Sequence, residues 1–152
     1  MCMLIELIKN ITNDPSLPSL TQMEVKGIFT QQLAGKLSTT PLVILSDPNY
    51  TTITDQKIRQ IYYESDLRGT TYDIDKHDCD DFSVRFKAAL AKAVTYDWSS
   101  KYSYAAGIVF GYIPTPHAIN WFITPEKKLM FFEPQTGEVF APKGKNIFFL
   151  YS

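Results

Sequence analysis

Three residues with chemically reactive side chains follow one another along the chain: Cys79, His117 and Glu133. Asp78 is a good N-cap, which places Cys79 in the first turn of a helix. At that position, unpaired backbone N–H groups and the positive end of the helix dipole favour a thiolate. A thiolate, an imidazole and a carboxylate are the components of a nucleophilic triad. The order of these residues therefore predicts acyl-transfer chemistry.

Each of the three residues has a distinct role in this interpretation. Cys79 attacks a carbonyl carbon as the thiolate, and its own backbone N–H is a candidate donor to the oxyanion. His117 takes the thiol proton and later protonates the leaving group, while Glu133 orients the imidazole and stabilises its charged form. Two further residues, Asn120 and Gln135, are candidates for binding the substrate.

The elements around these residues are predicted to bring them together. His117 opens one expected strand and Glu133 closes the next, and antiparallel neighbours place the start of one strand beside the end of the other. The helix that begins at Cys79 then has only to point its N-terminus toward that end of the sheet. Asn120 is a weaker partner for the imidazole, because three residues of alternation place it on the opposite face of the strand from His117.

The motifs that carry these residues resemble a known group of enzymes. The segment Asp-Cys-Asp-Asp-Phe at residues 78 to 82 resembles the nucleophile motif of bacterial transglutaminase-like cysteine proteinases. The dipeptide His117-Ala118 matches the His-Ala that begins a strand in that group, and Glu133 matches its third landmark, a carboxylate at the end of the following strand. The resemblance covers residues 72 to 140.

A second similarity lies in residues 133 to 137, Glu-Pro-Gln-Thr-Gly, which are similar to the Asp-x-Gln-x-Gly segment of papain-like toxin and protein-deamidase domains. Together, the resemblances imply an α+β fold of the papain-like or transglutaminase-like kind, with N-terminal helices and a central helix packed on an antiparallel β-sheet. They imply a cysteine hydrolase or acyltransferase that acts on an amide through a thioester: a thiol peptidase, a deamidase or a transglutaminase. Such an enzyme needs no cofactor or metal, and its partner is a protein or peptide substrate. Glu133 departs from the Asp that is usual in the group.

Other interpretations of the same residues stay open. The second hypothesis is a non-catalytic binding or inhibitory protein that carries a degenerate site on the same scaffold. The acidic residues around Cys79 oppose its ionisation, since a nearby negative charge raises the pKa of a thiol. Together with His77, Cys79, His117 and Glu133, these carboxylates could also form a metal site, although the spacing lacks a Cys-x-x-Cys or His-x-x-x-His pair. The residues concerned are Asp75, Asp78, Asp80 and Asp81.

Composition limits the class of protein. The chain has 152 residues, of which 45% are apolar and 20% charged, and this predicts a single globular domain with a helical part at residues 1 to 70 and a core at residues 71 to 152. A net charge of −1 argues against a nucleic-acid partner, and the short apolar runs argue against a membrane span. Two cysteines make no disulfide framework, which favours a cytoplasmic location. The oligomeric state is not predicted.

Apolar periodicity and turn residues predict the individual elements. Helices are expected at residues 4 to 11, 22 to 34, 54 to 63 and 79 to 94, and a short extended segment at 42 to 45. Strands are expected at residues 105 to 113, 117 to 124, 128 to 132, 138 to 141 and 146 to 151. The buried residues are expected to include Phe82, Phe86, Leu90, Ile108, Phe110, Trp121 and Phe131.

Overall fold

A computed structural model describes residues 16–152 of the chain, so the helix expected at residues 4 to 11 lies outside the described part. The helices are α2 (Gln22–Gln32), α3 (Asp55–Glu64), α4 (Cys79–Val94) and a short 3-10 helix, Leu67–Gly69. The strands are β1 (Ser19–Thr21), β2 (Leu37–Ile44), β3 (Asn49–Thr51), β4 (Ala106–Tyr112), β5 (Pro116–Ile123), β6 (Leu129–Glu133), β7 (Glu138–Phe140) and β8 (Lys145–Tyr151).

Local capping explains where the three helices begin. Thr21 caps α2 in a reciprocal capping box with Glu24, and Thr54 accepts the backbone N–H of Lys57 at the start of α3. At α4 the Asp81 carboxylate accepts the backbone N–H of Asp78 at 3.3 Å. The predicted helix from residue 79 to residue 94 is confirmed at both ends.

The main sheet has six strands in the order β2-β8-β4-β5-β6-β7. Neighbours from β8 to β7 are antiparallel, but β2 pairs in parallel with β8. The expected antiparallel sheet was therefore wrong: the sheet is mixed. The parallel strand comes from the part of the chain expected to be helical, which also supplies β1 and β3 as a separate two-stranded sheet.

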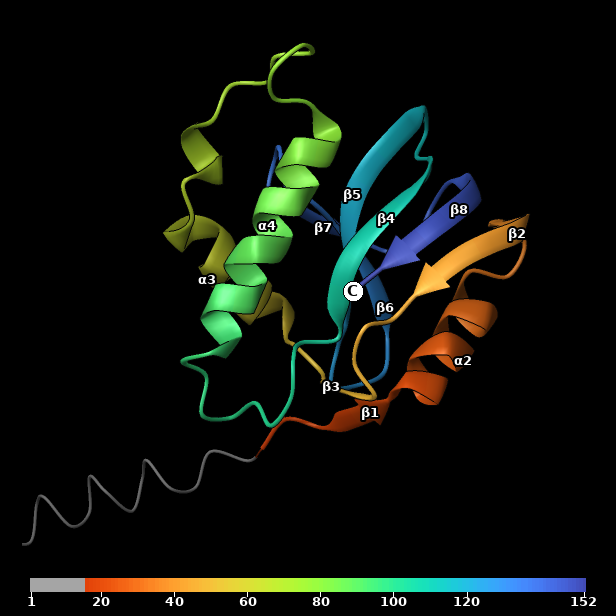
Figure 1. Cartoon of the computed structure of the whole chain (residues 1–152), viewed down its shortest axis with the longest axis vertical. Coiled ribbons are helices and arrows are strands. Elements are labelled where there is room, and N and C mark those ends of the chain that lie inside the picture. Colours follow the sequence, from red (N-terminus) through yellow and green to blue (C-terminus); the bar gives the residue numbers. More distant parts are fainter. Residues whose placement is uncertain (1–15) are drawn as a thin grey trace, which may run out of the picture.

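Helices cover both faces of the six-stranded sheet (Figure 1): α2 lies on one side, and α3 and α4 lie together on the other. Under α2, the fully buried Trp121 meets Phe29 edge-to-face with ring centroids 4.8 Å apart. Under α4, Phe86 packs on Phe132 at 4.4 Å. The predicted core is confirmed except for Phe110, which is only partly buried because no helix covers that part of the sheet.

Two close contacts fix the position of α4 and of the chain end against the sheet. The Asn120 side chain on β5 donates to the carbonyl of Ser83 on α4 at 3.0 Å and to that of Gly107 on β4 at 3.1 Å. At Gly107 itself a Cβ would lie 1.8 Å from the carbonyl oxygen of Tyr151, so only glycine allows β8 to approach so closely.

Candidate functional site

His117 and Glu133 lie side by side at the end of the sheet where β5 begins and β6 ends. The imidazole Nε2 is 2.5 Å from Oε2 of Glu133, and the other carboxylate oxygen accepts the backbone N–H of Gln135 at 3.1 Å. Both side chains are largely shielded, with exposed fractions of 20% and 15%. The carboxylate therefore holds the ring in one orientation, and only Nδ1 is left to face another group.

Cys79 is the first residue of α4, and its thiol lies close to the backbone of Ala118, the residue after His117. Burial raises the pKa of the thiol, and the charges of Asp78 and Asp80 raise it further. The backbone N–H groups of Ala118 and of Cys79 itself act in the opposite direction, but burial and the carboxylates prevail. The environment thus favours the neutral thiol, where the helix start alone was expected to favour the thiolate.

The structure brings Cys79, His117 and Glu133 to one end of the sheet but joins only two of them. Among residues 16–152, no hydrogen bond links the sulfur to the imidazole. Beside the His117–Glu133 pair is a cavity of about 330 Å³, whose walls include Thr136, Glu138 and Phe140.

The other residues selected from the sequence have different surroundings. Asn120 is buried to 1% exposure under α4 and donates to the backbone carbonyls of Ser83 and Gly107, and its substrate-binding role stays a prediction. Gln135 is partly buried in the turn after β6. His77 contacts Arg85 at 2.7 Å, and Arg85 in turn pairs with Asp66, also at 2.7 Å.

The expected acidic surroundings of Cys79 are present at the start of α4. Asp78, Cys79 and Asp80 each offer one ligand atom within 4.8 Å of the others. The hydrogen bond to Asp78 and its negative charge raise the pKa of the Asp80 carboxyl. The charges of Asp78 and Asp80 add to the effect of burial, which is the main reason why the pKa of the Cys79 thiol is raised.

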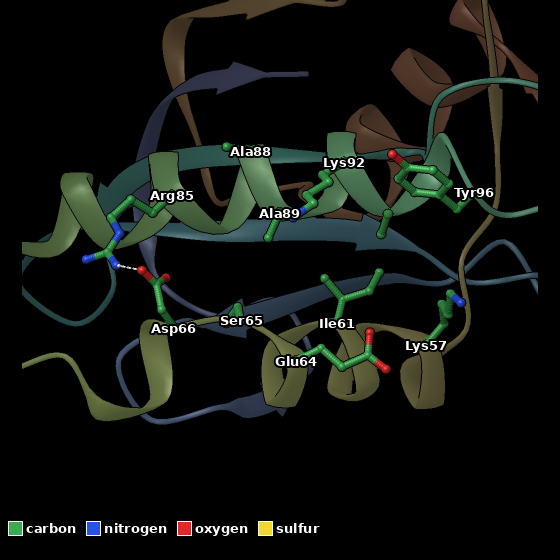
Figure 2. Close-up of a pocket in the computed structure, with 11 residues that line it drawn as sticks. Lys57, Ile61, Glu64, Ser65, Asp66, Arg85, Ala88, Ala89, Lys92 and Tyr96 are labelled. Carbon is green, nitrogen blue, oxygen red and sulfur yellow. Dashed lines mark ion pairs between the residues drawn. The ribbon is translucent and has the colours of Figure 1, made fainter.

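A larger hollow of about 700 Å³ lies between α3 and α4, away from the predicted residues. Figure 2 shows side chains of the two helices facing each other across it, with the Arg85–Asp66 pair at one end and Tyr96 near Lys57 at the other. The apolar part of its surface includes Ile61 and small alanine side chains of α4. Sequence reasoning missed this groove, because periodicity indicates which face of a helix is buried but not how far two helices stand apart.

Comparison with known proteins decides the family. A family model described as "Agglutinin C-terminal" matches residues 50–139, more than half of the chain. The chain belongs to the agglutinin C-terminal family. The matched range includes Cys79, His117 and Glu133, and it also includes every residue that lines the groove between α3 and α4.

Two solved structures are similar over 88% of this chain, each at 28% identity. One, described as "PSL1a-E64 complex", has a TM-score of 0.76, and the other, with a TM-score of 0.70, is the Polyporus squamosus lectin bound to a human-type influenza-binding epitope, Neu5Aca2-6Galb1-4GlcNAc. The agglutinin C-terminal chain spans about half the length of these proteins, 51% of the first and 49% of the second. No curated protein sequence matches it.

These findings correct the interpretation drawn from motifs. The assignment to papain-like or transglutaminase-like cysteine proteinases was wrong, because the chain matches the agglutinin family and the mixed sheet matches the lectin structures. The functions inferred from that assignment were therefore wrong as well: thiol peptidase, deamidase and transglutaminase. Three short motifs in the right order are compatible with more than one family, whereas the family model rests on 90 consecutive positions, 50 to 139.

Proposed function

We propose that this agglutinin C-terminal chain acts as a carbohydrate-binding domain and holds its ligand in the groove between α3 and α4. The family, and the glycan to which one similar lectin is bound, support a sugar ligand. The groove volume of about 700 Å³ is typical of sites for small ligands. This function corresponds to the binding protein that the sequence left open beside the hydrolase.

The observation that carries the proposal is the composition of the groove end around Tyr96. This tyrosine is 73% exposed just beyond α4, so its ring is available to the apolar C–H face of a pyranose. Lys57 and Lys92 line the same end, and within residues 16–152 neither forms an ion pair. Their ammonium groups can donate to sugar hydroxyls or to a sugar carboxylate, while the Glu64 carboxylate can accept from hydroxyls.

The test is titration calorimetry of the full chain with the trisaccharide Neu5Aca2-6Galb1-4GlcNAc, preceded by a glycan array to find better ligands. Tyr96→Ala is expected to weaken binding about tenfold, the effect of losing roughly 1.4 kcal/mol. Tyr72→Ala is the matched control, because Tyr72 is also exposed but lies outside the groove. Equal affinity of the two variants, or no glycan bound by the folded chain, contradicts the proposal.

The roles predicted from the sequence for the residues around the His117–Glu133 pair stay predictions. His117, Glu133 and Gln135 lie on or next to the smaller cavity, and we propose that they form a second polar contact area for a ligand. His117→Ala tests this by the same titration, and an unchanged affinity limits the ligand to the groove between the helices.

A further inference from the structure

The loop after α4 carries a tryptophan whose side chain lies entirely in solvent. Trp98 is fully exposed, and Tyr96, two residues earlier, is largely exposed and lines the groove between α3 and α4. An indole ring is a large apolar surface, and burying it would stabilise the fold. Single exposed apolar residues are nevertheless common on protein surfaces, so what distinguishes Trp98 from them is the way in which its loop is held.

Asp97, which lies between the two aromatic residues, is the centre of a hydrogen-bond network. One carboxylate oxygen accepts the backbone N–H of Ser99 at 3.0 Å and the Ser99 hydroxyl at 2.6 Å. The other oxygen accepts the hydroxyl of Tyr104, a side chain that is buried in the core on the α3 and α4 side of the sheet. Both sequence neighbours of Trp98 are therefore linked to the core.

Three further hydrogen bonds hold the second half of the loop. The backbone N–H of Ser100 donates to the carbonyl of Asp97 at 3.1 Å, and the Ser100 hydroxyl donates to the carbonyl of Tyr102 at 2.7 Å. The backbone N–H of Tyr102 donates to the hydroxyl of the fully buried Thr51 at 2.9 Å. Because the free protein already holds the loop in place, a ligand that contacts Trp98 does not have to order it, and binding costs less conformational entropy.

The charge of Asp97 relates the loop to the groove. Burial opposes the ionisation of this carboxyl, but the hydrogen bonds from Ser99 and Tyr104 outweigh it and lower the pKa of Asp97. The positive charge of Lys57, which lines the groove, acts in the same direction as these hydrogen bonds. Such an interaction weakens with distance, so Lys57 lies near the loop. Figure 2 shows Tyr96 and Lys57 at the same end of the groove, and the loop continues from that end.

The spacing of the two aromatic residues suits a ligand of more than one sugar. Tyr96 and Trp98 are two positions apart, so their Cα atoms lie within about 7 Å of each other. Each aromatic ring offers an apolar surface to the C–H face of one pyranose. An oligosaccharide has such faces in succession, whereas a monosaccharide fills only one contact of this kind.

We propose that Trp98 is a second sugar contact outside the groove, and that the ligand is an oligosaccharide with one sugar at Tyr96 and a neighbouring sugar at Trp98. The inference rests on the glycan-binding function proposed above, and it adds the class of ligand and a residue that selects for it. The rival explanation of the exposed indole is a contact with a second copy of the chain.

Fluorescence quenching reports on Trp98 directly. The chain has two tryptophans, and the other, Trp121, is fully buried, so acrylamide should quench mainly Trp98. The probe is the trisaccharide Neu5Aca2-6Galb1-4GlcNAc, or the oligosaccharide of the glycan array that binds most tightly. At saturation it should lower the quenching constant and shift the emission to shorter wavelengths, because a sugar ring then covers the indole. Galactose alone should change the quenching constant less.

Calorimetry of substituted chains measures the contribution of the indole. Trp98→Ala should reduce the ratio of oligosaccharide affinity to galactose affinity about threefold to tenfold, the effect of losing one ring contact. Trp98→Phe retains an aromatic ring at this position and should restore most of that ratio. Tyr72→Ala is the control, because Tyr72 is exposed but lies outside the groove and the loop.

The outcomes separate this inference from the function on which it rests. If the oligosaccharide binds Trp98→Ala as tightly as the parent chain, the contact at Trp98 is overturned and glycan binding in the groove remains. If the folded parent chain binds no glycan, both are overturned. If quenching of Trp98 falls as the protein concentration rises in the absence of sugar, a second copy covers the indole, and this result also overturns the proposal.

Discussion

The two faces of the six-stranded sheet differ in how polar their buried side chains are, and two neighbouring residues of β5 show this difference. On the face under α2, Trp121 is fully buried among apolar side chains. One position earlier, Asn120 points to the opposite face, where it is just as buried but donates to two backbone carbonyls. The first face is stabilised mainly by apolar burial, although the Trp121 indole also donates to the carbonyl of Tyr151. The second face includes a buried amide whose hydrogen bonds hold α4 against the sheet.

This difference separates the candidate sites. Cys79 and the groove beside Tyr96 belong to the α3 and α4 side. The His117–Glu133 pair points to the opposite face, because alternation along the strands places His117 with Trp121 on β5 and Glu133 with Phe131 on β6. Substitutions on the α2 face should therefore lower the free energy of unfolding most. Substitutions on the α4 face should lower it less, and should instead change the position of α4 and the reactivity of Cys79.

The largest effect is expected for Trp121→Ala. The change removes a fully buried indole that packs on Phe29 and donates to the carbonyl of Tyr151 at 3.2 Å. The free energy of unfolding should fall by about 3–5 kcal/mol, as measured by urea titration. Trp98→Ala is the control, because Trp98 is fully exposed at 101% and its loss should stay within about 0.5 kcal/mol. Similar losses for the two variants contradict the division of roles between the faces.

Much of this arrangement was predictable, because it depends on local patterns. The Asp78 cap and the apolar period predicted α4 from residue 79 to residue 94, and the antiparallel order of consecutive strands predicted that His117 lies beside Glu133. The parallel pairing of β2 with β8 was not predictable, since the two strands are about a hundred residues apart and alternation does not identify a partner. The pKa of Cys79 was misjudged for a related reason: the helix start is visible in the sequence, but the depth of burial is not.

A smaller effect is expected for Asn120→Ala on the α4 face. The substitution removes the donor to Ser83 and Gly107, and the free energy of unfolding should fall by about 1–3 kcal/mol. Ser83→Ala should cost less, because the Ser83 hydroxyl donates only to the carbonyl of Cys79 within the same helix. Hydrogen exchange should accelerate along α4 in the Asn120 variant and remain close to the parent rate in the Ser83 variant. A smaller loss for Asn120→Ala than for Ser83→Ala would show that the hydrogen bonds of the Asn120 side chain do not hold α4 in position.

The smallest effect concerns reactivity and is expected without a loss of stability. Because burial and two carboxylates raise the pKa of Cys79, the thiolate fraction at neutral pH should be below that of a free thiol. Iodoacetamide should therefore alkylate a Cys2→Ser variant more slowly than free cysteine at pH 7, with a rate that rises at alkaline pH. Asp80→Asn removes one opposing charge, lowers the pKa and should accelerate the reaction, whereas Glu126→Gln, at the far end of β5, should leave the rate unchanged. Rapid alkylation at pH 6 to 7 would mean that the thiol is ionised in spite of its surroundings, and the α4 face would then be a reactive surface as well as a positioning one.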